Sequence, residues 1–132
     1  MEEISPEEPK KKTSLGIDEN IEALLAYVLM WLTGIIFIVL EKKSDFVRFH
    51  AMQSTITFLG INIIQIVLWM ISVILGAVFG PLAALIGIFI MLVNLVGLIF
   101  WVLGMIKAYQ GEYYKFPIFG DLAEKWVGKV NV

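Results

Sequence analysis

Two long stretches without any charged side chain constrain this chain more than any other feature. No Asp, Glu, Lys or Arg occurs between Glu22 and Glu41, and none occurs between Arg48 and Lys107. A soluble protein of 132 residues needs charged helix faces, and the 59% of hydrophobic residues exceeds the ~45–50% of soluble domains. We therefore predict an all-α integral membrane protein, because helices satisfy their own backbone hydrogen bonds in lipid. The lipid bilayer is its first expected partner.

Three apolar runs are long enough to cross the bilayer as helices, since about 20 residues match a ~30 Å hydrocarbon core. The predicted spans are residues 21–40, 51–79 and 82–106. Ser44 is a suitable N-cap, so a helix is expected to start at the interface and run into the second span. Gly80-Pro81 breaks the pattern between the second and third spans, which predicts an antiparallel helical hairpin.

The ends of the chain differ from this membrane domain, which is assigned to residues 18–110. Residues 1–17 are rich in Glu, Pro and Lys and have little to bury, so this tail is predicted to be disordered. Residues 111–132 form a second tail with Tyr113, Tyr114 and Trp126, which are typical of the membrane–water boundary. Within it, residues 121–130 are predicted to form a short helix on the membrane surface.

The distribution of Lys and Arg predicts the orientation. With three spans, the first loop and the C-terminal tail share one side, which carries seven basic residues, namely Lys42, Lys43, Arg48, Lys107, Lys115, Lys125 and Lys129. The other side carries the remaining three, Lys10, Lys11 and Lys12. The positive-inside rule then predicts a cell-membrane protein with its N-terminus outside and its C-terminus in the cytoplasm.

A polar stripe follows one face of the helix around the second span. With Phe46 at its start, it consists of His50, Gln53, Ser54, Thr57, Gln65 and Ser72. A polar face inside a membrane must meet protein or water. We expect interhelical hydrogen bonds that hold the bundle together. The alternative is a hydrophilic path lined by the stripe.

A line of small residues marks the third span. Its predicted members are Gly87, Asn94, Gly97 and Gly104, spaced by threes and fours. Small residues let two helix backbones approach closely in a membrane. The line therefore predicts a packing seam, either against the first two spans of the same chain or against another subunit.

The sequence offers no set of catalytic residues, metal ligands or cofactor-binding motifs. His50 is the only histidine, and a lone histidine beside a helix entry favours a structural hydrogen-bonding role. Cysteine is absent, and no zinc, phosphate-loop or dinucleotide motif occurs. The predicted spans contain no Asp or Glu apart from Glu22 at the start of the first, which argues against ion-coupled transport. We predict a protein without enzymatic activity, cofactor, metal or nucleic-acid partner.

Several segments together resemble a known family. They are LLAY at 24–27, TGIIF at 33–37, FVRFHAMQS at 46–54 and AYQGEYYKFPIFGD at 108–121. The chain resembles a group of small, largely uncharacterised archaeal and bacterial multi-pass membrane proteins. That group is similar to the chloroplast inner-envelope import (Tic) component and to the magnetosome membrane proteins MamF and MmsF. The resemblance implies a multi-pass fold, with import-channel and crystal-maturation roles among the relatives.

The sequence leaves two functions open. The first is a non-enzymatic membrane protein that acts by self-association, as a homo-oligomer, or by assembly with other membrane proteins. The second is a pore-forming or translocation component that lines a polar path as an oligomer, since three helices alone enclose no pore.

Overall fold

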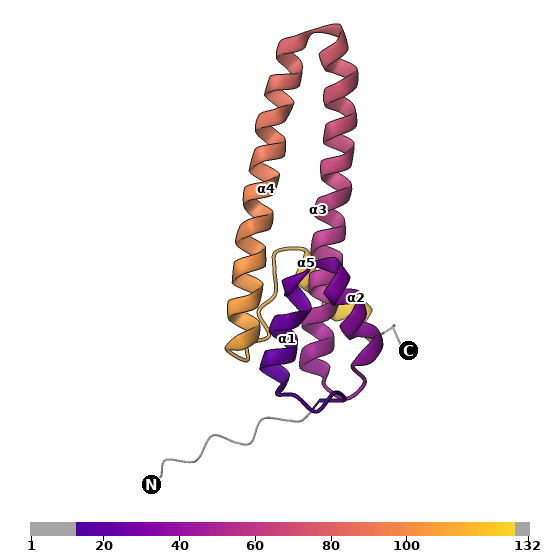
Figure 1. The fold of residues 1–132 in the computed structure, drawn as a ribbon, viewed down its shortest axis with the longest axis vertical. Helices are drawn as coiled ribbons and strands as arrows, with labels where there is room; N and C mark the ends of the chain where they lie inside the picture. Colours follow the sequence, from indigo (N-terminus) through magenta and orange to yellow (C-terminus); the bar gives the residue numbers. More distant parts are fainter. Residues whose placement is uncertain (1–12, 129–132) are drawn as a thin grey trace.

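The computed structural model describes residues 13–128, and its dominant feature is a long helical hairpin (Figure 1). Helix α3 runs from Asp45 to Val78 and α4 from Gly80 to Tyr109. Both are long and apolar enough to cross a membrane. The Ser44 side chain caps α3 by accepting a hydrogen bond from the Val47 N–H at 3.2 Å. The predicted helix start and the antiparallel hairpin are thus confirmed.

The first apolar run does not form the third span that its length predicted. It divides into α1, Glu19–Val28, and α2, Trp31–Leu40, each of ten residues. The two helices fold back on each other beside the lower part of α3 and α4 (Figure 1). The prediction of one helix over residues 21–40 is therefore wrong, and the described residues contain two span-length helices.

Local hydrogen bonds explain the break between α1 and α2. Met30 adopts a positive φ of 61°, which reverses the chain direction. The Thr33 hydroxyl donates to the Ala26 carbonyl at 3.0 Å and accepts from the Leu29 N–H at 3.1 Å, so it holds both sides of the turn. At Gly34 an added Cβ would lie only 2.8 Å from the Ala51 carbonyl oxygen. The missing side chain lets α2 press against α3.

The two ends of the α1–α2 pair meet at the base of the hairpin. The Ser14 N–H donates to both carboxylate oxygens of Glu41, at 3.0 and 3.1 Å. The Ser44 hydroxyl donates to Glu19 at 2.7 Å. Residues 13–19 and 41–44 therefore lie together at the base, whereas three spans would separate the N-terminal segment from the first loop by the length of a span. Residues 13–17 of the predicted disordered tail form an ordered turn, and residues 1–12 lie outside the described residues.

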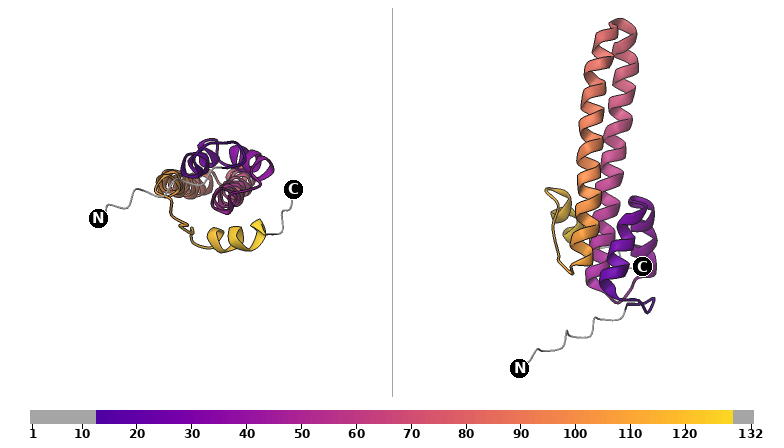
Figure 2. Two further views of the ribbon diagram at one scale, coloured as in Figure 1. Left: turned by 90° about the horizontal axis from the view of Figure 1, so that it is seen from below. Right: turned by 60° about the vertical axis from the view of Figure 1, so that its left-hand side comes forward.

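Helix α5, Phe119–Val127, completes the base of the molecule. It begins two residues before the predicted short helix, whose last two residues lie outside the described part of the chain. Seen along the hairpin, α5 lies across the helix axes, against α3 (Figure 2). The base holds the core, with Tyr27, Phe58 and Phe116 almost fully buried. Farther along the hairpin the apolar side chains point outward.

Candidate functional site

A buried hydrogen-bond network joins three separate parts of the chain at the base. The Nδ1 of His50 lies 2.7 Å from the Tyr27 hydroxyl, and its Nε2 lies 2.7 Å from the Glu112 carbonyl oxygen. A carbonyl oxygen only accepts, so His50 Nε2 carries the proton and donates to it. The neutral ring then accepts at Nδ1 from the Tyr27 hydroxyl. His50 thereby links α1, α3 and the segment after α4.

Gln53 extends this network through three hydrogen bonds, with both N–H donors of its amide in use. Its Nε2 donates to the Tyr27 hydroxyl at 2.9 Å and to the Tyr114 carbonyl at 3.0 Å. Its Oε1 accepts from the Phe116 N–H at 2.9 Å. The side chain is fully buried. Residues 112–116 belong to no helix or strand, and His50 and Gln53 fix this segment to α3.

Aromatic rings enclose the network. Phe46 and Phe49 pack on His50 in T-shaped arrangements, with ring centroids 4.7 and 5.2 Å away. Tyr113 packs on both phenylalanines. Phe46, the first member of the predicted motif, therefore contacts His50 directly. The arrangement leaves no open route to the imidazole ring, which suits a structural group better than a catalytic one.

The remaining members of the polar stripe do not meet at one place. The Ser54 hydroxyl donates to the Met30 carbonyl at 2.8 Å and holds the α1–α2 turn against α3. The Thr57 hydroxyl is buried without a hydrogen-bond partner among the described residues. Gln65 lies farther up and donates to Asn94 of α4. Ser72 is half-buried in the outer part of the hairpin. The stripe thus divides between the base and the α3–α4 interface.

The small residues of α4 also meet different neighbours. A Cβ at Gly104 would lie 2.7 Å from the Tyr27 ring, so α4 packs tightly on α1 there. A Cβ at Gly97 would lie 3.6 Å from Ile61 of α3, which is ordinary contact. At Gly87 an added Cβ would meet nothing within 4 Å. The lower seam therefore packs within the chain, and the upper seam is open.

Two buried carboxyl groups at the base escaped the sequence analysis. Glu22 is fully buried, and its two oxygens have no hydrogen-bond donor among the described residues. Burial and the neighbouring Glu41 raise the pKa of Glu22 to about 7. Burial alone would raise the pKa of Glu41 too, but the neighbouring Glu22 carboxyl and hydrogen bonds from the Ser44, Ser14 and Lys43 N–H groups lower it. This pattern fits a protonated Glu22 beside an ionised Glu41.

A second polar group lies above the α1–α2 turn, where α3 and α4 have no further helix beside them. The Trp31 Nε1–H donates to Asn62 Oδ1 at 2.9 Å, and one turn along α3 Gln65 bonds to Asn94. An open groove of about 480 Å³ runs along Trp31, Asn62, Gln65 and Trp69. The sequence analysis found Gln65 and Asn94 but missed Asn62. Its neighbour Trp31 was the available signal, since a buried indole N–H needs an acceptor.

The described residues place no three His, Cys, Asp or Glu side chains where they would hold a metal ion. The fold and its polar clusters instead define a helical membrane protein with an intramembrane hairpin and a hydrogen-bonded base. The chain belongs to the magnetosome magnetite crystal formation protein family, since the sequence model of that family matches residues 17–123. This match confirms the resemblance to MamF and MmsF, and the resemblance to the Tic component stays a prediction.

The chain is also similar to uncharacterised archaeal membrane proteins. Two UPF0132 membrane proteins of Methanocaldococcus jannaschii are 49% and 48% identical, over 86% and 87% of this chain and 73% and 94% of theirs. A UPF0132 membrane protein of Archaeoglobus fulgidus is 43% identical over 85% of this chain and 98% of its own. No solved structure matches the chain.

Proposed function

We propose that this protein acts without enzymatic activity by associating with itself in the bilayer, through the open side of the α3–α4 hairpin. The observation that carries the proposal is the pair of amides, Gln65 and Asn94, in the outer, apolar part of the hairpin. Asn94 is exposed and Gln65 is half-buried. In hydrocarbon, an unpaired polar group costs several kcal/mol.

Both amides have hydrogen-bonding capacity left. Gln65 Nε2 donates to Asn94 Oδ1, and Asn94 Nδ2 donates to the Ile90 carbonyl. Gln65 Oε1 has no donor among the described residues, and each Nδ2 or Nε2 carries a second hydrogen. An amide is both donor and acceptor, so two copies related by a twofold axis satisfy each other. Gly87, on the same side of α4 with open space around it, permits close approach.

The alternative of a polar path has less support. His50, Gln53 and Ser54 form their hydrogen bonds within the chain and Thr57 is fully buried, which leaves Gln65 and Ser72 to line such a path. Electrical recording of the protein in planar bilayers tests this alternative, and a silent bilayer is the expected result.

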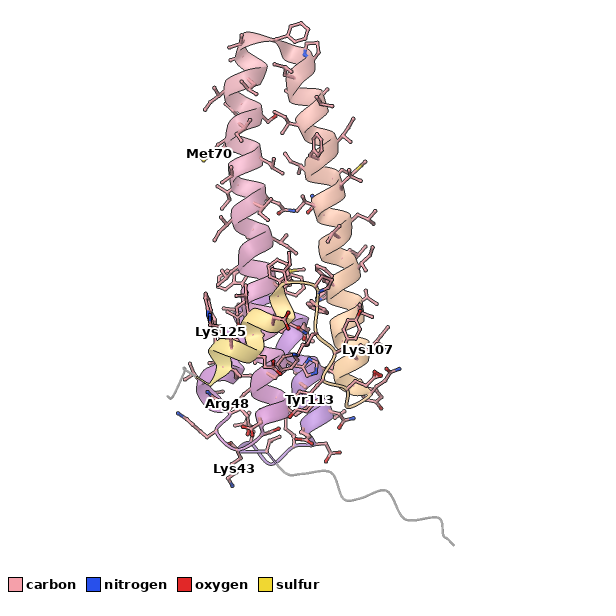
Figure 3. All side chains as sticks on the ribbon, turned by 180° about the vertical axis from the view of Figure 1, so that it is seen from behind. Lys43, Arg48, Met70, Lys107, Tyr113 and Lys125 are labelled. Atoms are coloured by element: carbon pink, nitrogen blue, oxygen red, sulfur yellow. The ribbon has the colours of Figure 1, made fainter. Side chains whose placement is uncertain are left out.

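We also propose that the base of the hairpin faces the cytoplasm. Six basic residues of the described part of the chain lie at this end: Lys42, Lys43, Arg48, Lys107, Lys115 and Lys125, four of which Figure 3 labels. Residues 49–106, which include the outer turn of the hairpin, contain no Asp, Glu, Lys or Arg. The positive-inside rule therefore favours a cytoplasmic base, with residues 13–19 on the same side.

Cysteine cross-linking tests the association, since the chain has no native cysteine. Gly87→Cys, which leaves both amides in place, is expected to form disulfide-linked dimers in native membranes. Phe89→Cys is the matched control, because residue 89 is exposed and points about 200° away from residue 87 on the same helix. Native mass spectrometry of the Gln65→Leu variant should show loss of the oligomer. Equal cross-linking at both positions, or a monomeric wild type, contradicts the proposal.

A further inference from the structure

The α1–α2 pair reaches only part of the way into the bilayer. Each helix has ten residues, a length of about 15 Å against a ~30 Å hydrocarbon core. Leu29, at the turn between them, is 59% exposed. Exposed apolar side chains continue along the outer face of α2, namely Leu32, Ile35, Ile36, Val39 and Leu40. These faces suit lipid, so the pair occupies about one leaflet.

Both ends of the pair are held at the base, so it enters and leaves the membrane on the same side. The Glu41 carboxylate accepts from the Ser14 and Ser44 N–H groups. The Arg48 guanidinium donates to the Ile38 carbonyl at 3.0 Å and to the Glu41 carbonyl at 2.6 Å, which closes the end of α2. These bonds exclude a rearrangement of α1 and α2 into one span without loss of the base.

Helix α5 adds further bulk at the same level. Its first residue, Phe119, packs on α3 where Gly60 leaves room, since a Cβ there would lie 3.2 Å from the ring. Lys115 pairs with Glu124 at 2.9 Å on the outer side, and Ile118 and Trp126 are exposed. Crosswise placement and an apolar and a charged face are typical of a helix in the interfacial plane (Figure 2).

The molecule is consequently much wider at the base than at the tip. In the described part of the chain, α1, α2 and α5 lie beside the lower part of α3 and α4, and only α3 and α4 continue beyond it (Figures 1 and 2). A helix with side chains is about 10 Å across, so α1 and α2 add roughly 160 Å² to one leaflet. A bilayer accommodates such excess area in one leaflet by bending, with the wider end on the convex side. Insertions that enter one leaflet are sensitive to curvature for this reason.

We propose that this protein is a curvature-selective wedge, which binds preferentially to membrane whose base-side leaflet is the convex one. The wedge needs one copy of the chain only, so it is independent of self-association. At high density the same shape bends a flat membrane so that the leaflet at the base becomes convex and the leaflet at the outer turn becomes concave.

Membrane nanotubes pulled from giant phosphatidylcholine vesicles test the wedge. Two single-cysteine variants of the full chain, Lys125→Cys at the base and Gly80→Cys at the tip, are reconstituted and labelled from outside with an impermeant dye. Each label selects one orientation, and both positions are exposed. Base-out molecules should be enriched in the tube relative to the flat membrane, increasingly so in thinner tubes. Tip-out molecules should be depleted.

The two orientations control for each other, because they share fold, lipid and dye. Equal partitioning of both populations overturns the proposal, as does enrichment of both, which would show a response to tube geometry without a wedge. The same measurement in the Gln65→Leu background should give the same opposite partitioning. Retained oligomers with retained sorting would reject the amide contact and keep the wedge, whereas loss of oligomers with equal partitioning of the two orientations would reject the wedge alone.

Discussion

Gly104 of α4 lies against the ring of Tyr27, so closely that a Cβ at residue 104 would be 2.7 Å from Tyr27 Cε1. Tyr27 is itself fully buried and bonded to His50, so its ring has no room to move aside. The Phe116 ring would lie 3.0 Å from the same Cβ. The contact therefore joins the hairpin to the base, and it leaves no space for a side chain at residue 104.

Gly104→Ala is expected to lower the free energy of unfolding by about 1–3 kcal/mol, because overpacking a tight contact costs that much. Thermal unfolding in detergent measures it. Gly97→Ala should cost much less, since its nearest neighbour would be in ordinary contact at 3.6 Å. Gly87→Leu should leave monomer stability unchanged. Equal effects at residues 87 and 104 would show that the lower seam is not a packing contact.

His50 should tolerate replacement by a side chain that both donates and accepts. His50→Gln keeps a donor for the Glu112 carbonyl and an acceptor for the Tyr27 hydroxyl, so little stability is lost. His50→Leu removes the buried acceptor of the Tyr27 hydroxyl proton and the donor to the Glu112 carbonyl, and the buried hydroxyl proton left without an acceptor costs about 1–3 kcal/mol. Thermal unfolding and protease resistance of residues 112–116 report the difference. A folded His50→Gln protein that loses its cellular phenotype would instead assign His50 a functional role.

The long helices were predictable because their signals are local. Uncharged length, the Ser44 cap and the Gly80-Pro81 break each act within a few residues, and the structure follows all three. The division of the first run was not predictable from hydropathy, since α1 and α2 are as apolar as one span. The determinants are Thr33, which bonds to both sides of the turn, and Gly34, which contacts α3. The need for glycine at residue 34 becomes visible only in the contact between α2 and α3.

The polar groups divide in the same way. His50 and Gln53 were singled out because they interrupt an apolar helix, but besides the Tyr27 hydroxyl their partners are backbone groups of residues 112–116, about 60 positions away. Backbone donors and acceptors leave no mark in a sequence. Glu22 and Glu41 look like ordinary flanking charges of a predicted span, and they become a buried pair only because the span folds back.

The Glu22–Glu41 pair predicts that stability falls as the pH rises from about 4.5 to about 7. The folded-state pKa of Glu22 is about 7 against a usual 4.5, so the folded protein binds this proton more tightly than the unfolded chain. The stability that this proton contributes is complete below pH 4.5 and is lost as the pH rises through about 7. The contribution is at most roughly 3 kcal/mol. Glu41, with a lowered pKa, acts in the opposite direction in more acidic solution.

Glu22→Gln removes the titrating proton and keeps the shape, so its melting temperature should vary less with pH over that range than that of the wild type. Glu124→Gln is the control, because Glu124 is exposed on α5. Melting curves of the three proteins at a series of pH values make the comparison. Parallel curves for wild type and Glu22→Gln would show that Glu22 does not titrate in this window.

The folded-back α1–α2 pair makes a topological prediction that differs from three spans. Leu15, Lys125 and Gly80 are all exposed. Leu15 follows Ser14, which bonds to Glu41 at the base, Lys125 belongs to α5 at the base, and Gly80 begins α4 at the outer turn. Single cysteines at these positions should therefore fall into two groups, which are accessible to the reagent from opposite sides of the membrane. An impermeant thiol reagent added to intact cells should react with Gly80→Cys and spare Leu15→Cys and Lys125→Cys, which react only after the cells are opened. Three spans require Leu15→Cys and Lys125→Cys to label from opposite sides, and that result would contradict the folded-back pair and the Ser14–Glu41 hydrogen bonds at its base.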